Sequence, residues 1–284
     1  MMERQELPEL DDPWMLVAFE GWNDAADAAT GVIDHLIEWW DAELIGELDP
    51  EDYYDFQVNR PHVGPDAHGD RIITWPTTRF YVARPAGADR DILLVRGIEP
   101  NMRWRQFVEE LIGVADLTGV QMVVTLGALL ADTPHTRPIP VSGTTSDPLL
   151  STSLHLEEST YEGPTGINGV FADTCVSSEI PSASLWAAVP HYVGQPPCPK
   201  ATLALLGQLE DVLEVSVPLG DLVEASKAWE RGVEELASED SEIAEYVEAL
   251  EQARDTSELP EATGDAIARE FERYLKRRSR DSDT

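Results

Sequence analysis

The chain has 284 residues, and 54 acidic side chains against 20 Lys and Arg side chains give it a formal net charge of −34. This charge excludes a general affinity for nucleic acid, which starts with cationic side chains neutralising phosphates, and it excludes a polybasic membrane-surface protein. Because 42% of the residues are hydrophobic, a sizeable buried core is expected rather than wholesale disorder.

The acidic residues are concentrated in two parts of the chain. Residues 1–60 hold 17 acidic and 2 basic residues, and residues 205–264 hold 17 and 3. Between them, residues 61–204 hold 15 acidic and 9 basic residues, a net charge of −6. We interpret the two acidic parts as solvated faces that aid solubility or that meet a basic partner.

Strand and helix patterns alternate along most of the chain. The apolar run of residues 14–19 predicts a strand, and apolar residues at helical spacing over 25–40 predict the helix that follows it. Residues 49–70 are rich in Asp, Pro, His and Gly and are predicted to be a loop. Further strands are predicted at 44–48, 71–75, 80–83, 92–95, 120–126, 139–142 and 183–189, and further helices at 104–119, 166–176 and 203–213.

This alternation predicts the α/β class with a largely parallel sheet. After Pro218 only helical periodicity remains, and helices are predicted at 222–236, 243–250 and 267–275. We therefore divide the chain into an α/β core domain over residues 1–216 and an all-helical C-terminal extension over residues 217–284.

The sequence also favours a cytoplasmic, reducing setting. Residues 1–12 are acidic and match no secretory signal, and Cys175 and Cys198 lack metal or redox spacing. The two long uncharged stretches are not membrane spans, because residues 117–131 are too few and residues 180–199 contain five prolines.

Four predicted strands end in polar residues, and ligands of parallel α/β sheets bind beyond the carboxyl ends of the strands. If these side chains converge, they form a pocket that could carry out acid/base chemistry or hold a small anion. The alternative is that they are polar because loops are solvated, and that Glu20 pairs with Arg96 only to neutralise two charges. The candidate pocket residues are Glu20, Trp22, Asn23, Asp24, Arg96, Glu99, His135, Arg137, His191 and Tyr192.

Glycines also precede a predicted helix at residues 163–166. Because backbone N–H groups at a helix N-terminus can bind an anion, Gly163, Thr165 and Gly166 complete the candidate pocket. The alternative is a tight turn that leads into the helix. The sequence contains no dinucleotide fingerprint, phosphate-loop motif or nucleophile elbow.

No residue is assigned a catalytic or metal-binding role. His62 and His68 share a predicted loop with Asp66 and Asp70, but their spacing matches no metal-site template. We therefore expect no metal and no cofactor, and whether the chain is an enzyme stays open, with a non-enzymatic role preferred.

Seven short segments between residues 14 and 250 occur in a characteristic order and spacing. They are Glu20–Ala25, Leu94–Pro100, Thr125–Leu129, Pro134–Pro138, Gly143–Pro148, Gly163–Ile167 and Ala188–Tyr192. Taken together, they resemble the proteasome assembly chaperone 2 family, in its bacterial branch.

The resemblance implies a three-layer αβα sandwich similar to nucleoside phosphorylases, with a helical C-terminal extension. It also implies self-association, with a homotrimer as the expected form, and for eukaryotic and archaeal relatives a role in assembling the proteasome α ring. Two functions follow. The first is a chaperone-like interaction or assembly factor, with proteasome subunits as possible partners. The second is a phosphorylase-like enzyme, or a small-anion or nucleoside-binding protein, that uses the strand-end pocket, with Arg96 and Arg137 holding an anion.

Overall fold

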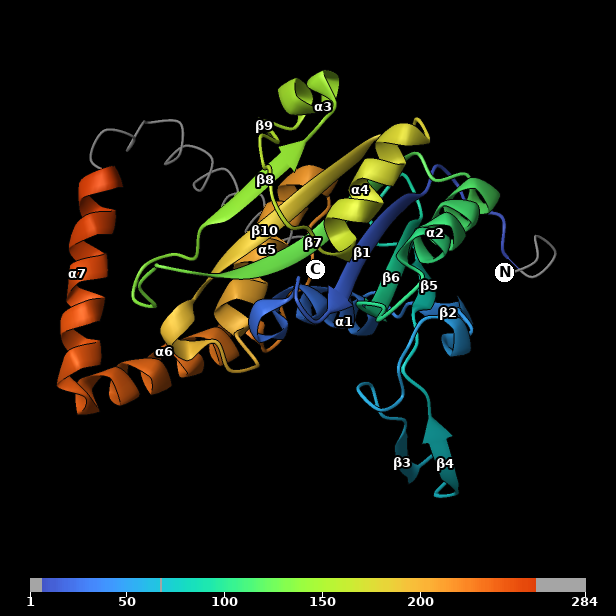
Figure 1. The fold of residues 1–284 in the computed structure, drawn as a ribbon. Coiled ribbons are helices and arrows are strands. Elements are labelled where there is room, and N and C mark those ends of the chain that lie inside the picture. Colours follow the sequence, from blue (N-terminus) through green and yellow to red (C-terminus); the bar gives the residue numbers. More distant parts are fainter. Residues whose placement is uncertain (1–6, 67, 259–284) are drawn as a thin grey trace.

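An eight-stranded sheet forms the centre of the molecule in the computed structural model, which describes residues 7–66 and 68–258 (Figure 1). In their spatial order the strands are β2 (Glu43–Glu47), β5 (Arg79–Ala83), β6 (Ile92–Ile98), β1 (Trp14–Glu20), β7 (Met122–Ala131), β10 (Ser182–Pro190), β8 (Val141–Thr145) and β9 (Glu157–Glu158). The four central strands β6, β1, β7 and β10 pair in parallel. Antiparallel pairing joins β2 to β5, β5 to β6 and β8 to β10.

Helices cover both faces of this sheet. Helices α1 (Ala28–Trp39) and α5 (Pro199–Leu213) pack on one face, and α2 (Trp104–Thr118) and α4 (Ile167–Ser177) pack on the other. The mixed α/β class and the arrangement in three layers agree with the prediction.

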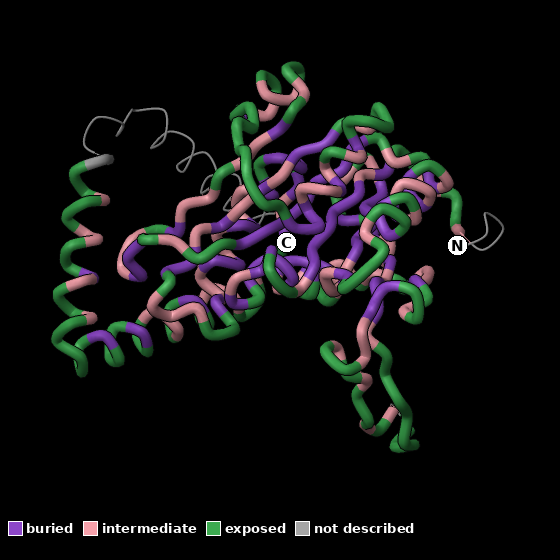
Figure 2. Tube along the Cα trace, viewed as in Figure 1, coloured by how far each residue is buried: buried purple, intermediate pink, exposed green. Residues whose placement is uncertain are grey.

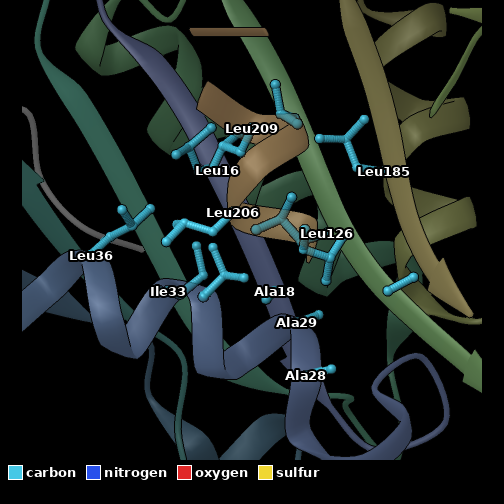
Figure 3. Close-up of a cluster of buried hydrophobic side chains, with 14 of the residues drawn as sticks. Leu16, Ala18, Ala28, Ala29, Ile33, Leu36, Leu126, Leu185, Leu206 and Leu209 are labelled. Carbon is cyan, nitrogen blue, oxygen red and sulfur yellow. The ribbon is translucent and has the colours of Figure 1, made fainter. Parts of the chain in front are cut away.

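Two clusters of buried hydrophobic side chains lie between these layers, one on each face of the sheet. In β1, Leu16 and Ala18 belong to the cluster shared with α1 and α5, whereas Met15 and Val17 belong to the cluster shared with α2 and α4. Successive side chains of a strand point to opposite faces, so a strand covered on both faces must be apolar at every position. This is why continuous apolar runs predicted the central strands correctly. Figure 3 shows the first cluster, in which α1 and α5 contribute Ile33, Leu36, Leu206 and Leu209.

The region predicted to be a loop over residues 49–70 contains regular structure. Strand β3 (His62–Pro65) pairs with β4 (Arg71–Thr74) in an antiparallel hairpin that stands away from the sheet (Figure 1). The loop prediction was wrong here because β3 includes Gly64 and Pro65, residue types that propensity assigns to turns. Two short elements, α3 (Pro148–Ser153) and β9, were also not predicted.

After the core the chain forms two helices. Helix α6 (Leu222–Glu239) packs on α5, and α7 (Ser241–Glu258) follows α6 at the far side of the molecule (Figure 1). The helix predicted at 267–275 lies outside the described residues. Within the described part of the chain, no helix is long and apolar enough to cross a membrane. Whether residues 217–284 are a unit separate from the core stays a prediction.

Both edge strands of the sheet carry glutamates. At one edge β2 begins at Glu43 and ends at Glu47, and at the other edge β9 consists of Glu157 and Glu158. All four side chains are exposed.

A close approach between neighbouring strands generates the first prediction. A Cβ added at Gly97 in β6 would press on Thr78 Oγ1 and would lie 2.9 Å from Cδ1 of buried Phe19. We expect Gly97→Ala to lower the free energy of unfolding by about 1–3 kcal/mol. Gly113→Ala is the matched control, because a Cβ at this position of α2 meets nothing within 4 Å. It should raise stability by about 0.5–1 kcal/mol. Urea denaturation measures both, and an unchanged Gly97→Ala midpoint would contradict the packing.

Candidate functional site

The candidate pocket residues separate into two groups at the carboxyl ends of the central strands. One group follows β1 and β6, beside the start of α4, and the other follows β7 and β10, where α6 and α7 contact the core. We call them the β1–β6 group (Glu20, Trp22, Asn23, Asp24, Arg96, Glu99 and Gly166) and the β7–β10 group (His135, Arg137, His191 and Tyr192).

Arg96 of β6 is held between two carboxylates. Its guanidinium group contacts Glu20 at the end of β1, and it donates to both oxygens of Asp34 in α1 at 3.0 and 3.2 Å. Partial burial acts to lower the pKa of Arg96, but the hydrogen bonds and charges of Asp34 and Glu20 raise it above its ordinary value. The pairing of Glu20 with Arg96 that the sequence offered as an alternative is therefore present, and Asp34 was a partner that sequence reasoning missed.

Asp24 fixes the start of α1. Its buried carboxylate accepts hydrogen bonds from the backbone N–H groups of Ala29 (2.6 Å) and Thr30 (3.2 Å), and from the Thr30 hydroxyl. Burial raises the pKa of Asp24 to about 6, against the lowering effect of these hydrogen bonds. A carboxylate at the N-terminal end of a helix satisfies N–H groups that have no partner within the helix, so Asp24 joins β1 to α1.

The N-terminus of α4 receives a carboxylate from the same chain. Glu99 Oε1 accepts a hydrogen bond from the backbone N–H of Ile167 (2.9 Å) and another from Asn23 Nδ2 (2.8 Å). Gly166 leaves room for this contact, because a Cβ there would overlap the Asn23 side-chain amide. The helix start that the sequence offered as a candidate anion site, with a tight turn as the alternative, is thus occupied by Glu99.

The other residues predicted near this helix start lie at the surface. Gly163 and Thr165 are both exposed. Trp22, next to Asn23, leaves 66% of its surface in solvent. None of the three contributes an ionisable group to the β1–β6 group.

His135 lies buried under α6. The Tyr192 hydroxyl accepts from the His135 backbone N–H (2.7 Å) and lies 2.8 Å from Nδ1. Because the Glu234 carboxylate of α6 can only accept, Nε2 carries the proton of the neutral imidazole and donates to Glu234 at 3.0 Å, and the Tyr192 hydroxyl donates to Nδ1. Burial lowers the pKa of His135, although Glu234 acts in the opposite direction. Lys200 donates to the His135 carbonyl and to Glu230, which adds a second contact between α6 and the core.

Arg137 holds α7. It donates to both carboxylate oxygens of Asp255, at 2.8 and 2.9 Å, and to Glu251 at 3.3 Å. The Thr136 hydroxyl also donates to Glu251. A planar guanidinium group matches a carboxylate in this bidentate geometry, so the contact fixes the orientation of α7 as well as its position.

An aromatic cluster completes the contact with α7. The rings of His191, Tyr192 and Tyr246 meet edge to face, with centroids 5.4–6.1 Å apart. Tyr246 of α7 also donates to Asp132 at 3.1 Å, and Asp132 lies 3.3 Å from Nδ1 of His191.

Sequence reasoning missed the acidic partners in α6 and α7, although the spacing of these residues is a signal that could have indicated them. Glu230 and Glu234 are four residues apart, and so are Glu251 and Asp255. This spacing places each pair on one face of its helix, where both members can meet the same cationic surface. The sequence does not show which cation each pair meets.

In both groups, the charged and polar side chains are bonded to other residues of the same chain. Each candidate anion-binding arginine is engaged by two carboxylates, and His135 is bonded at both ring nitrogens. Among residues 7–66 and 68–258, no three His, Cys, Asp or Glu side chains are placed to hold a metal ion. The arrangement is suited to joining helices to the sheet.

Comparisons with known families and with solved structures agree on one family. A model of the PAC2 family matches residues 18–237. The chain is similar to a PAC2 family protein from Streptomyces avermitilis, with 59% identity, a TM-score of 0.78, and coverage of 83% of this chain and 100% of that chain. It is also similar to a proteasome-assembly chaperone homologue from Mycobacterium tuberculosis, with 54% identity, a TM-score of 0.74, and coverage of 83% and 99%. An archaeal proteasome activator from Pyrococcus furiosus shares the fold at 16% identity, with a TM-score of 0.65 and coverage of 81% and 96%. No curated protein matches.

The buried imidazole predicts a pH effect on stability. Because folding lowers the pKa of His135 below its ordinary value of 6.5, the unfolded chain binds this proton more readily, and stability should fall as the pH drops below about 6.5. His135→Gln lacks this titration, so its loss of stability between pH 7.5 and 5.5 should be smaller, by at most about 1.4 kcal/mol per pH unit. The raised pKa of Asp24 acts in the opposite direction but is common to both proteins. Urea unfolding measures the difference, and parallel pH profiles would contradict the assignment.

The contact of Arg137 with α7 generates a second prediction at this site. Arg137→Ala removes a bidentate ion pair that is partly exposed, so we expect roughly fivefold faster amide hydrogen exchange in α7 while the sheet is unaffected. Lys227→Ala is the control, because it removes an exposed ion pair with Glu224 inside α6. If α7 exchanges equally in Arg137→Ala and in the wild type, other contacts hold this helix.

Proposed function

The chain belongs to the PAC2 family, and we propose on that basis that it is a chaperone-like factor that assists the assembly of other proteins. Proteasome subunits are the partners to test first, because a relative 54% identical is named as a proteasome-assembly chaperone homologue. The likeness to the archaeal proteasome activator, at 16% identity, supports the fold alone.

The observation that carries the proposal is the engagement of both candidate anion-binding arginines. A phosphorylase-like enzyme, or a protein that binds small anions or nucleosides, would need cations that are open to its ligand. Here Arg96 is held by Glu20 and Asp34, and Arg137 is held by Glu251 and Asp255. This supports an α/β core over residues 1–216 that acts as a scaffold rather than as a catalytic unit. A cytoplasmic location is part of the proposal and rests on the sequence alone.

The surface for a partner in this proposal is the outer side of α6 and α7. Helix α7 stands at the end of the molecule and is largely exposed along its length (Figures 1 and 2). Its acidic residues differ in their contacts, because Glu251 and Asp255 contact Arg137 whereas Glu245 and Glu248 are exposed. An exposed acidic helix face suits a basic protein surface and steers its approach over a distance.

Binding of purified proteasome α subunits to the full chain tests the proposal. We expect binding that weakens as salt rises, and a loss of about fivefold or more in affinity in the double variant Glu245→Lys, Glu248→Lys. The matched control is Glu109→Lys, Asp116→Lys, which makes the same charge change on the exposed side of α2 and should bind like the wild type.

Two results would contradict the proposal. Absence of binding at both low and physiological salt would remove the proteasome as partner. In a thermal-shift series with phosphate, nucleosides and sugar phosphates, stabilisation of about 2.7 kcal/mol at a hundredfold excess over the dissociation constant would support the small-ligand function instead.

A further inference from the structure

Helix α7 is attached to the rest of the chain with little apolar burial. Over residues 241–256 it contributes no side chain to either buried cluster, and Val247 alone is buried. Helix α6 differs, because Leu222 and Trp229 pack against the first cluster. Since packing of an apolar face is the main source of stability for a helix in a protein, α7 depends on its polar contacts to stay on the core.

A single residue joins α6 to α7. Asp240 ends α6 in an extended conformation (φ −117°, ψ 111°), and its side chain accepts from the backbone N–H of Glu242 at the start of α7. A few residues at the ends of elements are enough to absorb a rotation of one element relative to another. Helix α7 can therefore change its position while α6 stays packed on α5 (Figure 1).

The polar contacts of α7 lie at different distances from this joint. Near the joint, the ring and the hydroxyl group of Tyr246 contact the core. Farther along the helix, Arg137 pairs with Glu251 and Asp255, and the three side chains are 32%, 27% and 53% exposed. Ion pairs with this exposure contribute little to stability, because water or another ion can take the place of either partner. The contact that holds the far part of α7 is therefore exchangeable.

The carboxylates that Arg137 holds belong to a longer acidic stripe. Glu248, Glu251 and Asp255 follow one another at intervals of three and four residues, so they lie on one side of α7. Glu248 is exposed and belongs to the surface proposed above for a basic partner. A cationic group bound at Glu248 therefore lies beside Glu251, which Arg137 already holds.

We infer that Arg137 is an intramolecular competitor of the basic partner. A guanidinium or ammonium group of the partner replaces Arg137 at Glu251 and Asp255, and the far part of α7 then leaves the core. The inference rests on the proposed function, because it takes α7 as the surface that a basic protein binds. The apparent dissociation constant is the intrinsic one divided by the fraction of molecules with α7 detached, so Arg137 weakens binding by keeping that fraction small.

The affinity of the full chain for purified proteasome α subunits tests the competition. Arg137→Ala removes the competing cation, so it should bind about threefold to fivefold more tightly than the wild type, in line with the expected increase in α7 exchange. The matched control is Arg79→Ala, which makes the same charge change. Arg79 is also 32% exposed, but it pairs with Glu47 at the sheet edge away from α7. This control should bind like the wild type, and equal affinities of the two variants would overturn the inference.

Detachment of α7 can also be measured without α subunits. Spin labels at Ala253→Cys in α7 and Gln106→Cys in α2 report the distance between two exposed positions, and the native Cys175 and Cys198 are buried. Acetyl-hexaarginine amide should broaden a single narrow distance distribution, and Arg137→Ala should broaden it without the peptide.

The two measurements separate the inference from the proposed function. A distance distribution that the peptide leaves unchanged would overturn the inference, even where α subunits bind. A distribution that the peptide broadens, in a chain that binds no α subunits, would support the competition and reject the proteasome as the partner.

Discussion

Charged groups at the carboxyl ends of the central strands lie partly out of water, and each must be neutralised where it lies. The chain meets this constraint with its own side chains. Arg96 forms ion pairs with carboxylates of β1 and α1, and Arg137 forms ion pairs with carboxylates of α7. At the start of α4, a backbone N–H group donates to the Glu99 carboxylate. Neutralisation therefore also sets where α1, α4 and α7 sit against the sheet, and it makes the strand ends a junction between layers.

The same constraint gives the acidic composition two different roles. In α6 and α7, several acidic residues contact Lys200 of α5, and His135 and Arg137 of the segment that follows β7. Other acidic residues of these helices, such as Glu235 and Glu245, are exposed to solvent. Net charge alone does not distinguish the two roles, because the difference depends on whether a cation of the core lies within reach of the residue.

Much of the fold follows from local patterns. The apolar runs at β1, β6 and β7 specify strands buried on both faces, and the helical periodicities mark α1, α2 and α5. Of the hairpin, β4 was predicted as a strand, whereas β3 was missed because it stands outside the core and shows no pattern of burial.

Part of the candidate site was predictable. The carboxyl ends of parallel strands lie at one edge of the sheet, and this brings Glu20, Arg96 and Glu99 together. The partners of His135 and Arg137 could not be foreseen. Glu234 lies 99 residues from His135 along the chain, and Asp255 lies 118 residues from Arg137. Contacts over such separations depend on how finished elements pack, and no local pattern encodes that.

The glutamates on β2 and β9 have a consequence for how copies of this chain can meet. An unpaired edge strand is a template onto which a strand of another molecule can add, and repeated addition produces aggregates without a size limit. If an edge strand of a second copy added at either end of this sheet, carboxylates would come alongside carboxylates, with Glu43 and Glu47 at one end and Glu157 and Glu158 at the other. This repulsion disfavours growth of the eight-stranded sheet by strand addition between copies.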